Sequence, residues 1–91
     1  MKLQNSGFDK NSTYFEYNLG SSGIPTVFIH GVGLDHTMWL PQKKHFHDKN
    51  VIFYDLLNHG RSKKGYKELK FNNFTDQLIQ LVEFLKINKF N

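Results

Sequence analysis

The segment Pro25-Thr-Val-Phe-Ile-His-Gly-Val-Gly33 decides how the rest of this 91-residue chain is interpreted. Its first part is apolar and β-branched, which predicts a buried strand from Thr26 to His30. Two glycines then flank Val32, and glycine lets the backbone turn sharply with little obstruction from side chains. An unobstructed main-chain N–H at such a turn is the kind of donor that an oxyanion hole needs. We therefore predict that the Val32 N–H is a catalytic hydrogen-bond donor.

A second apolar run, Val51 to Asp55, is followed by the tight loop Asn58-His-Gly-Arg-Ser62. Short, continuous apolar runs are typical of parallel strands that are covered on both faces. Residues 31–50 leave room for a crossover with a short helix, which we expect from His36 to Lys44. Both loops would then follow the carboxyl ends of parallel strands, where open α/β sheets bind their ligands.

The expected crossover helix has two candidate N-caps, Asp35 and Thr37. Its Met38 and Trp39 are predicted to face the core. Pro41 lies inside the same span, so the helix is expected either to begin late or to be broken there.

The remaining elements follow from local patterns. Thr13 to Leu19 alternates and is aromatic, which predicts a strand with one solvated face. Met1 to Gln4 is a candidate partner strand, joined to it by a turn in residues 5–12. Asn72 to Lys89 is predicted to be a helix with Asn73 as its N-cap, because apolar residues recur there at helical spacing: Phe74, Leu78, Leu81, Val82 and Leu85. The order predicts an α/β protein with a mostly parallel sheet and flanking helices.

Composition excludes several classes of function. The apolar content of 38% and the aromatic content of 15% favour a packed core over disorder. The absence of cysteine excludes a disulfide framework and a thiol nucleophile. The net charge of +4 comes from scattered lysines with a single arginine, so we predict no nucleic-acid partner. No apolar run approaches the roughly 18 residues of a membrane span, and no secretory leader is apparent. We therefore predict a cytoplasmic protein without a membrane partner.

The two glycine loops, taken together, carry a family resemblance. Residues 25–91 resemble the N-terminal part of α/β-fold hydrolases of the esterase, enol-lactonase and haloperoxidase-like kind. The matching motifs are the oxyanion loop His30-Gly31-Val32-Gly33, with Leu34-Asp35-His36 leading to Trp39, and the loop Asp55-x-x-Asn58-His59-Gly60-Arg61-Ser62. Residues 72–89 match the helix before the family's nucleophile strand. The family usually has glycine where Asn58 stands, but asparagine tolerates a positive φ.

The resemblance implies a role for each of these positions. The Val32 N–H would serve the oxyanion hole, and Leu34 and Trp39 are possible walls of a substrate pocket. The other motif residues would support the two loops: His30, Gly31, Gly33, Asp55, Asn58, His59, Gly60 and Ser62. His45 and His47 alternate but lack a third ligand nearby, so no metal site is predicted. No organic cofactor is implied.

The family's nucleophile motif, Gly-x-Ser-x-Gly, does not occur before Asn91. We therefore expect residues 1–91 to be the N-terminal portion of a single hydrolase domain, truncated before the nucleophile strand and inactive alone. In the complete protein, a Ser-His-Asp/Glu triad beyond residue 91 would act on a small ester, lactone or similar carbonyl substrate. Two alternatives remain open: a non-hydrolytic ligand-binding or cofactor-free member of the same fold, and a stand-alone small binding module.

Overall fold

The computed structural model describes residues 5–20 and 22–91, and within them four strands form one sheet in the order β1-β2-β4-β3. Their bounds are Asn5–Phe8 (β1), Tyr14–Asn18 (β2), Thr26–Ile29 (β3) and Val51–Tyr54 (β4). The pairs β1–β2 and β2–β4 are antiparallel, and β3–β4 is parallel. The expected parallel arrangement therefore holds only for β3 and β4. The strand expected at residues 1–4 lies outside the described residues, and residues 5–8, expected in a turn, form β1 instead.

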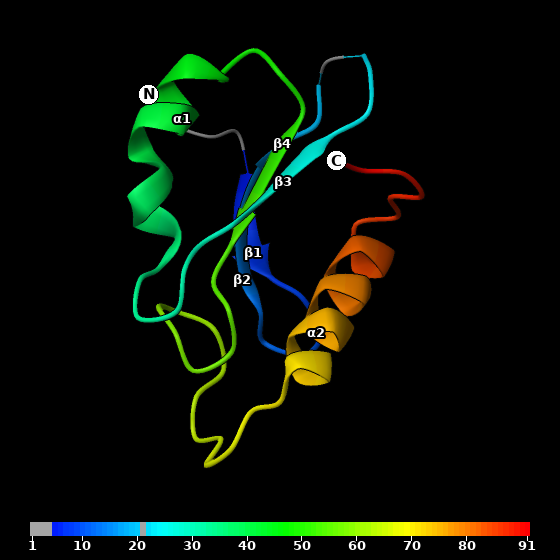
Figure 1. Cartoon of the computed structure of the whole chain (residues 1–91). Coiled ribbons are helices and arrows are strands. Elements are labelled where there is room, and N and C mark those ends of the chain that lie inside the picture. The colour runs from blue at the N-terminus through cyan, green and yellow to red at the C-terminus, as the bar shows by residue number, and fades with distance from the viewer. Residues whose placement is uncertain (1–4, 21) are drawn as a thin grey trace.

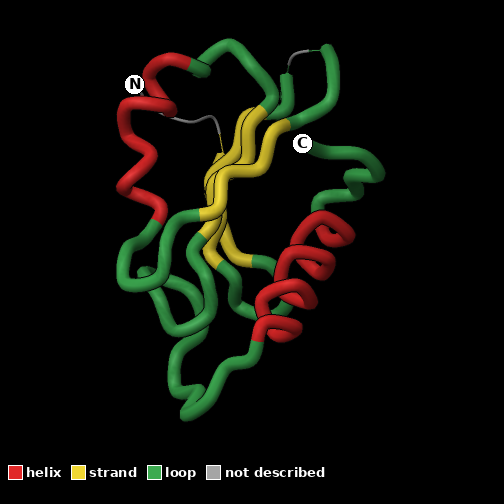
Figure 2. Tube along the Cα trace, viewed as in Figure 1, coloured by secondary structure: helices red, strands yellow, loops and turns green. Residues whose placement is uncertain are grey.

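Helices cover the two faces of the sheet, as Figure 1 and Figure 2 show. On one side lies α1 (Leu40–His45), preceded by the 3₁₀ turn η1 (His36–Trp39). On the other side lies α2 (Phe71–Phe84). The architecture is the α/β class that the sequence predicts. None of the helices in the described part of the chain is long and apolar enough to cross a membrane.

The crossover between β3 and β4 is two short helical pieces rather than one helix. Asp35 caps η1, since its carboxylate accepts the Thr37 N–H at 2.9 Å. Pro41 lies in the first turn of α1. A proline is tolerated there because the first N–H groups of a helix have no intrahelical partner. The proline thus marks where α1 begins and does not break it.

The face of the sheet beneath α1 is held by aromatic rings. Phe28 of β3 stacks on Phe53 of β4, with ring centroids 4.6 Å apart, and it also contacts Trp39 at 5.1 Å and Phe46 at 5.9 Å. Trp39 therefore packs as expected. The prediction for Met38 is wrong, because its side chain is exposed.

The face beneath α2 carries the main hydrophobic cluster, which consists of Phe15, Ile52, Tyr54, Leu56 and Leu81, with Phe74, Leu78 and Leu85 packed against it. The helix itself is shorter than predicted. It begins after Lys70, where the Asn73 side chain accepts the Lys70 N–H at 2.7 Å, so Asn73 lies inside the first turn and is not the N-cap. It ends at Phe84, because Lys86 has a φ of 60°.

β3 lies at one edge of the sheet. Asn91 is hydrogen-bonded along its outer side: the Val27 N–H donates to the Asn91 carbonyl at 2.8 Å, and the Asn91 N–H donates to the Pro25 carbonyl at 2.8 Å. This alternation is that of a parallel pair. β3 is only half-buried whereas β4 is buried throughout, so the prediction of two covered faces holds for β4 alone.

Candidate functional site

The candidate site consists of two loops at one edge of the sheet. The β3 loop (residues 30–35) follows β3, and the β4 loop (residues 55–62) follows β4. Because these strands are parallel neighbours, their carboxyl ends meet at the same edge. The structure therefore brings together the two motifs that the sequence singled out.

Glycine is required at two of the motif positions. Gly33 has a φ of 89°, in the left-handed region that favours glycine. Gly60 has a φ of 50°, and a Cβ added there would overlap the Asp55 carboxylate. Gly31 differs, because it has no positive φ and a Cβ there would make an ordinary contact of 3.6 Å with Leu34. The sharp turn after β3 therefore depends on Gly33.

Asn58 adopts a left-handed backbone conformation that favours glycine. Its φ is 67°, which confirms that asparagine can hold this position. Its side chain adds two bonds to Tyr66: the amide donates to the Tyr66 carbonyl at 2.9 Å, and the amide oxygen accepts the Tyr66 N–H at 3.1 Å. These bonds fasten the β4 loop to the segment that follows it.

Asp55 is the centre of the hydrogen bonds between the loops. Its buried carboxylate accepts three N–H groups: the His36 main chain at 2.7 Å, His36 Nδ1 at 2.8 Å and the Arg61 main chain at 2.9 Å. Ser62 Oγ donates to the Asp55 carbonyl at 2.5 Å and accepts the Tyr14 N–H at 2.9 Å. One carboxylate and one hydroxyl thus tie the β4 loop to the crossover and to β2.

A chain of charges continues from Asp55 across the sheet. His36 Nε2 lies 3.3 Å from Glu16, and Lys43 Nζ lies 2.5 Å from the other Glu16 oxygen. Burial raises the pKa of Glu16, but the hydrogen bonds from Lys43 and Tyr14 and the Lys43 charge outweigh burial and lower that pKa overall. Sequence reasoning missed this network. The one available signal was an acidic residue within the aromatic stretch that forms β2.

His30 and His59 each use both ring nitrogens on backbone groups. His30 Nδ1 is 2.8 Å from the Gly31 carbonyl, and His30 Nε2 accepts the Leu56 N–H at 2.9 Å. His59 Nδ1 is 2.8 Å from the Leu57 carbonyl, and its Nε2 accepts the Gly33 N–H at 2.9 Å. Neither ring is therefore placed as a free base.

The Val32 N–H differs from the amides that follow it. The Gly33 N–H is bonded to His59, and the Leu34 N–H donates to the Gly31 carbonyl at 3.1 Å. Within the described residues, the Val32 N–H has no hydrogen-bond partner, and the residue is 81% exposed. The Val32 N–H is thus an unbonded donor at the end of β3, as is the preceding Gly31 N–H among the described residues.

Val32 also borders an apolar groove of about 500 Å³ between β3 and α2. The residues that line the groove are Ile29, Val32, Tyr54, Leu56, Phe71, Phe74, Thr75 and Leu78. Leu34 and Trp39, the predicted pocket residues, are not among them. The helical spacing of Phe74 and Leu78 predicted that they lie in the core. They also line the groove, which the spacing alone could not show.

Comparisons with known proteins agree with this fold. The chain is 32% identical over 87 residues to "(E)-2-((N-methylformamido)methylene)succinate hydrolase" of Acinetobacter baylyi, covering 91% of this chain and 31% of that protein. A bromoperoxidase from Bacillus anthracis superposes with a TM-score of 0.82 at 27% identity over 94% of this chain and 33% of that one. An alpha/beta superfamily hydrolase from Oenococcus oeni superposes with a TM-score of 0.71 at 20% identity, over 90% of this chain and 31% of that one. The chain belongs to the α/β-hydrolase superfamily.

The match to the superfamily covers only part of each relative. A marine microorganism esterase, which superposes with a TM-score of 0.79 at 22% identity, aligns with 90% of this chain and 31% of its own. The α/β-hydrolase chain described here thus spans about a third of the length of the relatives it matches. No protein-family model matches it.

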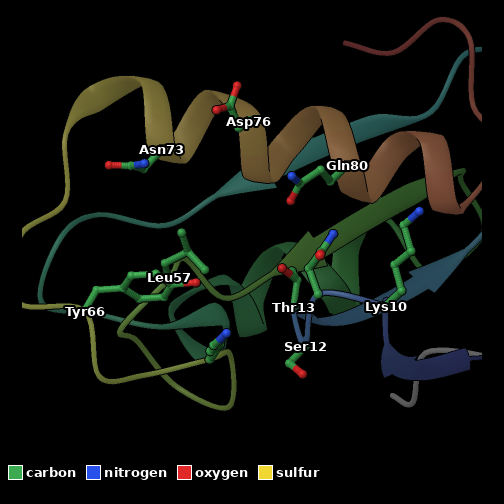
Figure 3. A pocket seen from close by; sticks show the side chains of 10 residues that line it. Lys10, Ser12, Thr13, Leu57, Tyr66, Asn73, Asp76 and Gln80 are labelled. Carbon is green, nitrogen blue, oxygen red and sulfur yellow. The ribbon is translucent and has the colours of Figure 1, made fainter.

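A second, polar pocket of about 310 Å³ lies between α2 and the turn that joins β1 to β2 (Figure 3). Asn73, Asp76 and Gln80 border it from the helix, and Ser12 and Thr13 border it from the turn. None of the β3 loop residues lines this pocket.

Three possible metal ligands also occur together in this α/β-hydrolase chain. Ligand atoms of Asp35, His36 and Asp55 lie within 4.8 Å of one another. Their atoms are engaged otherwise, because Asp55 Oδ1 is bonded to His36 Nδ1 and Asp35 accepts the Thr37 N–H. The hydrogen bonds account for the cluster without an ion.

Proposed function

We propose that this chain forms the N-terminal part of a hydrolase for a carboxylic ester, lactone or similar carbonyl compound, and that the Val32 N–H is one donor of its oxyanion hole. The observation that carries the proposal is the unbonded N–H of the exposed residue Val32 at the end of β3, directly before the Gly33 amide that His59 holds. Membership of the superfamily and the match to a curated hydrolase support it.

In the complete protein, a serine beyond residue 91 would attack the substrate carbonyl, a histidine would take and return its proton, and an acid would orient that histidine. The carbonyl oxygen becomes an oxyanion, and the Val32 N–H would stabilise it. Loss of one such donor typically costs about 2.7–4 kcal/mol of transition-state stabilisation.

The edge of β3 is the place where we put the strand that carries the nucleophile. The two hydrogen bonds of Asn91 set a parallel register against Pro25 and Val27. A strand continuing in that register would run beside Ile29 and reach the level of Val32. The apolar groove would then receive the side chains on one face of that strand.

The proposal is tested in a chimera in which residues 1–91 replace the matching segment of the marine esterase. Val32→Ala keeps the N–H, so we expect a modest fall in ester turnover. Val32→Pro removes the donor and should lower kcat by about a hundredfold or more. Circular dichroism must first show that both variants are folded, because proline also fixes φ. Equal turnover of the folded proline variant and the parent chimera would remove Val32 from the site.

A second candidate function is a cofactor-free, non-hydrolytic member of the same superfamily, and the likeness to the bromoperoxidase favours keeping it. The sequence beyond residue 91 separates the two. A serine in Gly-x-Ser-x-Gly with a later acid and histidine supports hydrolysis, whereas a replaced nucleophile supports ligand binding. For the 91-residue chain alone, we expect no hydrolysis of an activated ester above background.

A further inference from the structure

His30 and His59 form a reciprocal brace between the two loops. His59, on the β4 loop, accepts the N–H of Gly33 on the β3 loop at 2.9 Å. His30, on the β3 loop, accepts the N–H of Leu56 on the β4 loop at 2.9 Å. The two rings lie side by side, with centroids 5.2 Å apart. Each loop is therefore held by a side chain of the other.

Both bonds require one particular form of the histidine ring. The Nδ1 atom of each ring lies 2.8 Å from a carbonyl oxygen, of Gly31 for His30 and of Leu57 for His59. A carbonyl oxygen only accepts, so Nδ1 must carry the hydrogen. A backbone N–H only donates, so Nε2 must be bare. The brace thus consists of two neutral Nδ1–H rings, and a protonated ring would oppose a donor with a donor.

We propose that His59 is a positioning residue that fixes the peptide unit after Val32 and so sets the direction of the free Val32 N–H. His59 binds the N–H of the peptide unit directly after Val32, and Gly33, with its positive φ, has no Cβ to restrict that unit by itself. The catalytic consequence rests on the function proposed above for Val32, whereas the hydrogen bond to Gly33 can be measured without it.

The charged groups around the brace are unevenly placed. Asp55 Oδ1 lies 3.9 Å from His30 Nε2, Asp55 is itself bonded to His36, and Asp35 lies on the same loop as His30. Near His59, the described neighbours include the cation Lys64, which donates to the Gly60 carbonyl, and no described carboxylate lies within 4.0 Å of the His59 ring. The His59 ring is therefore oriented by its two hydrogen bonds to backbone groups and not by a carboxylate.

The first test is nuclear magnetic resonance of the ¹⁵N-labelled 91-residue chain. We expect the ring nitrogens of His59 to show a protonated Nδ1 and a bare Nε2, with a scalar coupling across the hydrogen bond to the Gly33 amide. His59→Leu, which removes the acceptor, should abolish the coupling and accelerate exchange of the Gly33 amide. A Gly33 amide that exchanges at the random-coil rate in the parent chain, or a ring protonated at Nε2, would overturn the proposal.

The second test uses the esterase chimera and two substitutions that differ in one property. His59→Gln offers an amide oxygen that can still accept the Gly33 N–H but does not titrate, and His59→Leu offers no acceptor. We expect the leucine variant to lose about tenfold to a hundredfold in kcat with a smaller change in KM, because a misplaced donor weakens the transition state most. The glutamine variant should recover most of kcat.

The matched control is His47→Leu, since the exposed His47 side chain contacts only the nearby Lys44 carbonyl, and its own carbonyl, which accepts the Asn18 amide, is kept. It should leave kcat unchanged. Equal losses in the glutamine and leucine variants would refute positioning through Gly33, because only packing would then matter. Failure of the oxyanion role of Val32 can be told apart from failure of the role of His59. In the first case Val32→Pro would leave turnover of the chimera unchanged, while the coupling between Gly33 and His59 would persist in the labelled chain.

Discussion

Replacing Asp55 by asparagine should destabilise the chain strongly, although the two side chains have nearly the same shape. The Asp55 carboxylate is fully buried and accepts three N–H groups, two from His36 on Oδ1 and one from Arg61 on Oδ2. Asparagine has one acceptor oxygen. If that oxygen faces His36, the amide NH₂ faces the Arg61 N–H, and two donors are opposed.

The cost follows from counting these bonds. One charge-assisted hydrogen bond, worth about 1.5–3 kcal/mol, is lost, and a buried donor is left without a partner. The two remaining bonds to His36 lose the negative charge that strengthened them. We therefore expect Asp55→Asn to lower the free energy of unfolding by about 2–4 kcal/mol.

Urea denaturation of the 91-residue chain, followed by circular dichroism, measures this loss. With an m-value of about 1–1.5 kcal/mol per molar urea for a small domain, the midpoint should fall by roughly 2 M. Glu68→Gln is the matched control, because Glu68 is exposed in a loop, and it should leave the midpoint unchanged. Equal midpoints for Asp55→Asn and the parent would refute the view that this carboxylate fastens the two loops.

Three further outcomes are expected. The fold lowers the pKa of Glu16, so the contribution of its carboxylate to stability is present above the ordinary value of 4.5 and is lost as the pH falls through the folded value. Lys43→Met should therefore destabilise the chain at neutral pH and progressively less below about pH 4. Urea midpoints measured across an acid titration check this. Gly60→Ala should lower the thermal midpoint by several degrees at least, since its methyl group would overlap the Asp55 carboxylate; an unchanged melt would mean that the loop can shift at no cost. The edge of β3 should make the chain self-associate with rising concentration, and Ile29→Lys should reduce this in sedimentation velocity; a parent chain that stays monomeric would contradict it.

The parts of the fold that the sequence predicted are those encoded by short patterns. The apolar runs that became β3 and β4 needed only a few adjacent residues to be recognised. The motif loops were predictable because Gly33, Asn58 and Gly60 adopt positive φ values that few residues tolerate. Where prediction erred, the deciding contact was specific: the Asn73 side chain accepts the Lys70 N–H from inside the helix, and asparagine at such a place resembles an N-cap in sequence.

The charged network could not be predicted in the same way. Glu16, His36 and Lys43 lie on a strand, a 3₁₀ turn and a helix, and no spacing in the chain relates them. They meet only because β2 pairs with β4 in a register that places Glu16 opposite Phe53, and α1 packs over that face. An antiparallel pairing of β2 with β4 had to be known first.

The candidate donor itself is defined by what its neighbours do. Val32 contributes an ordinary peptide N–H, and a valine side chain carries no chemistry. It becomes distinctive because His59 binds the Gly33 amide, a turn binds the Leu34 amide, and neither reaches Val32. The residues that matter for this site are therefore those that fix the peptide units after Val32, above all His59. Substitutions at His59 are for that reason a sharper test of the site than substitutions of the Val32 side chain.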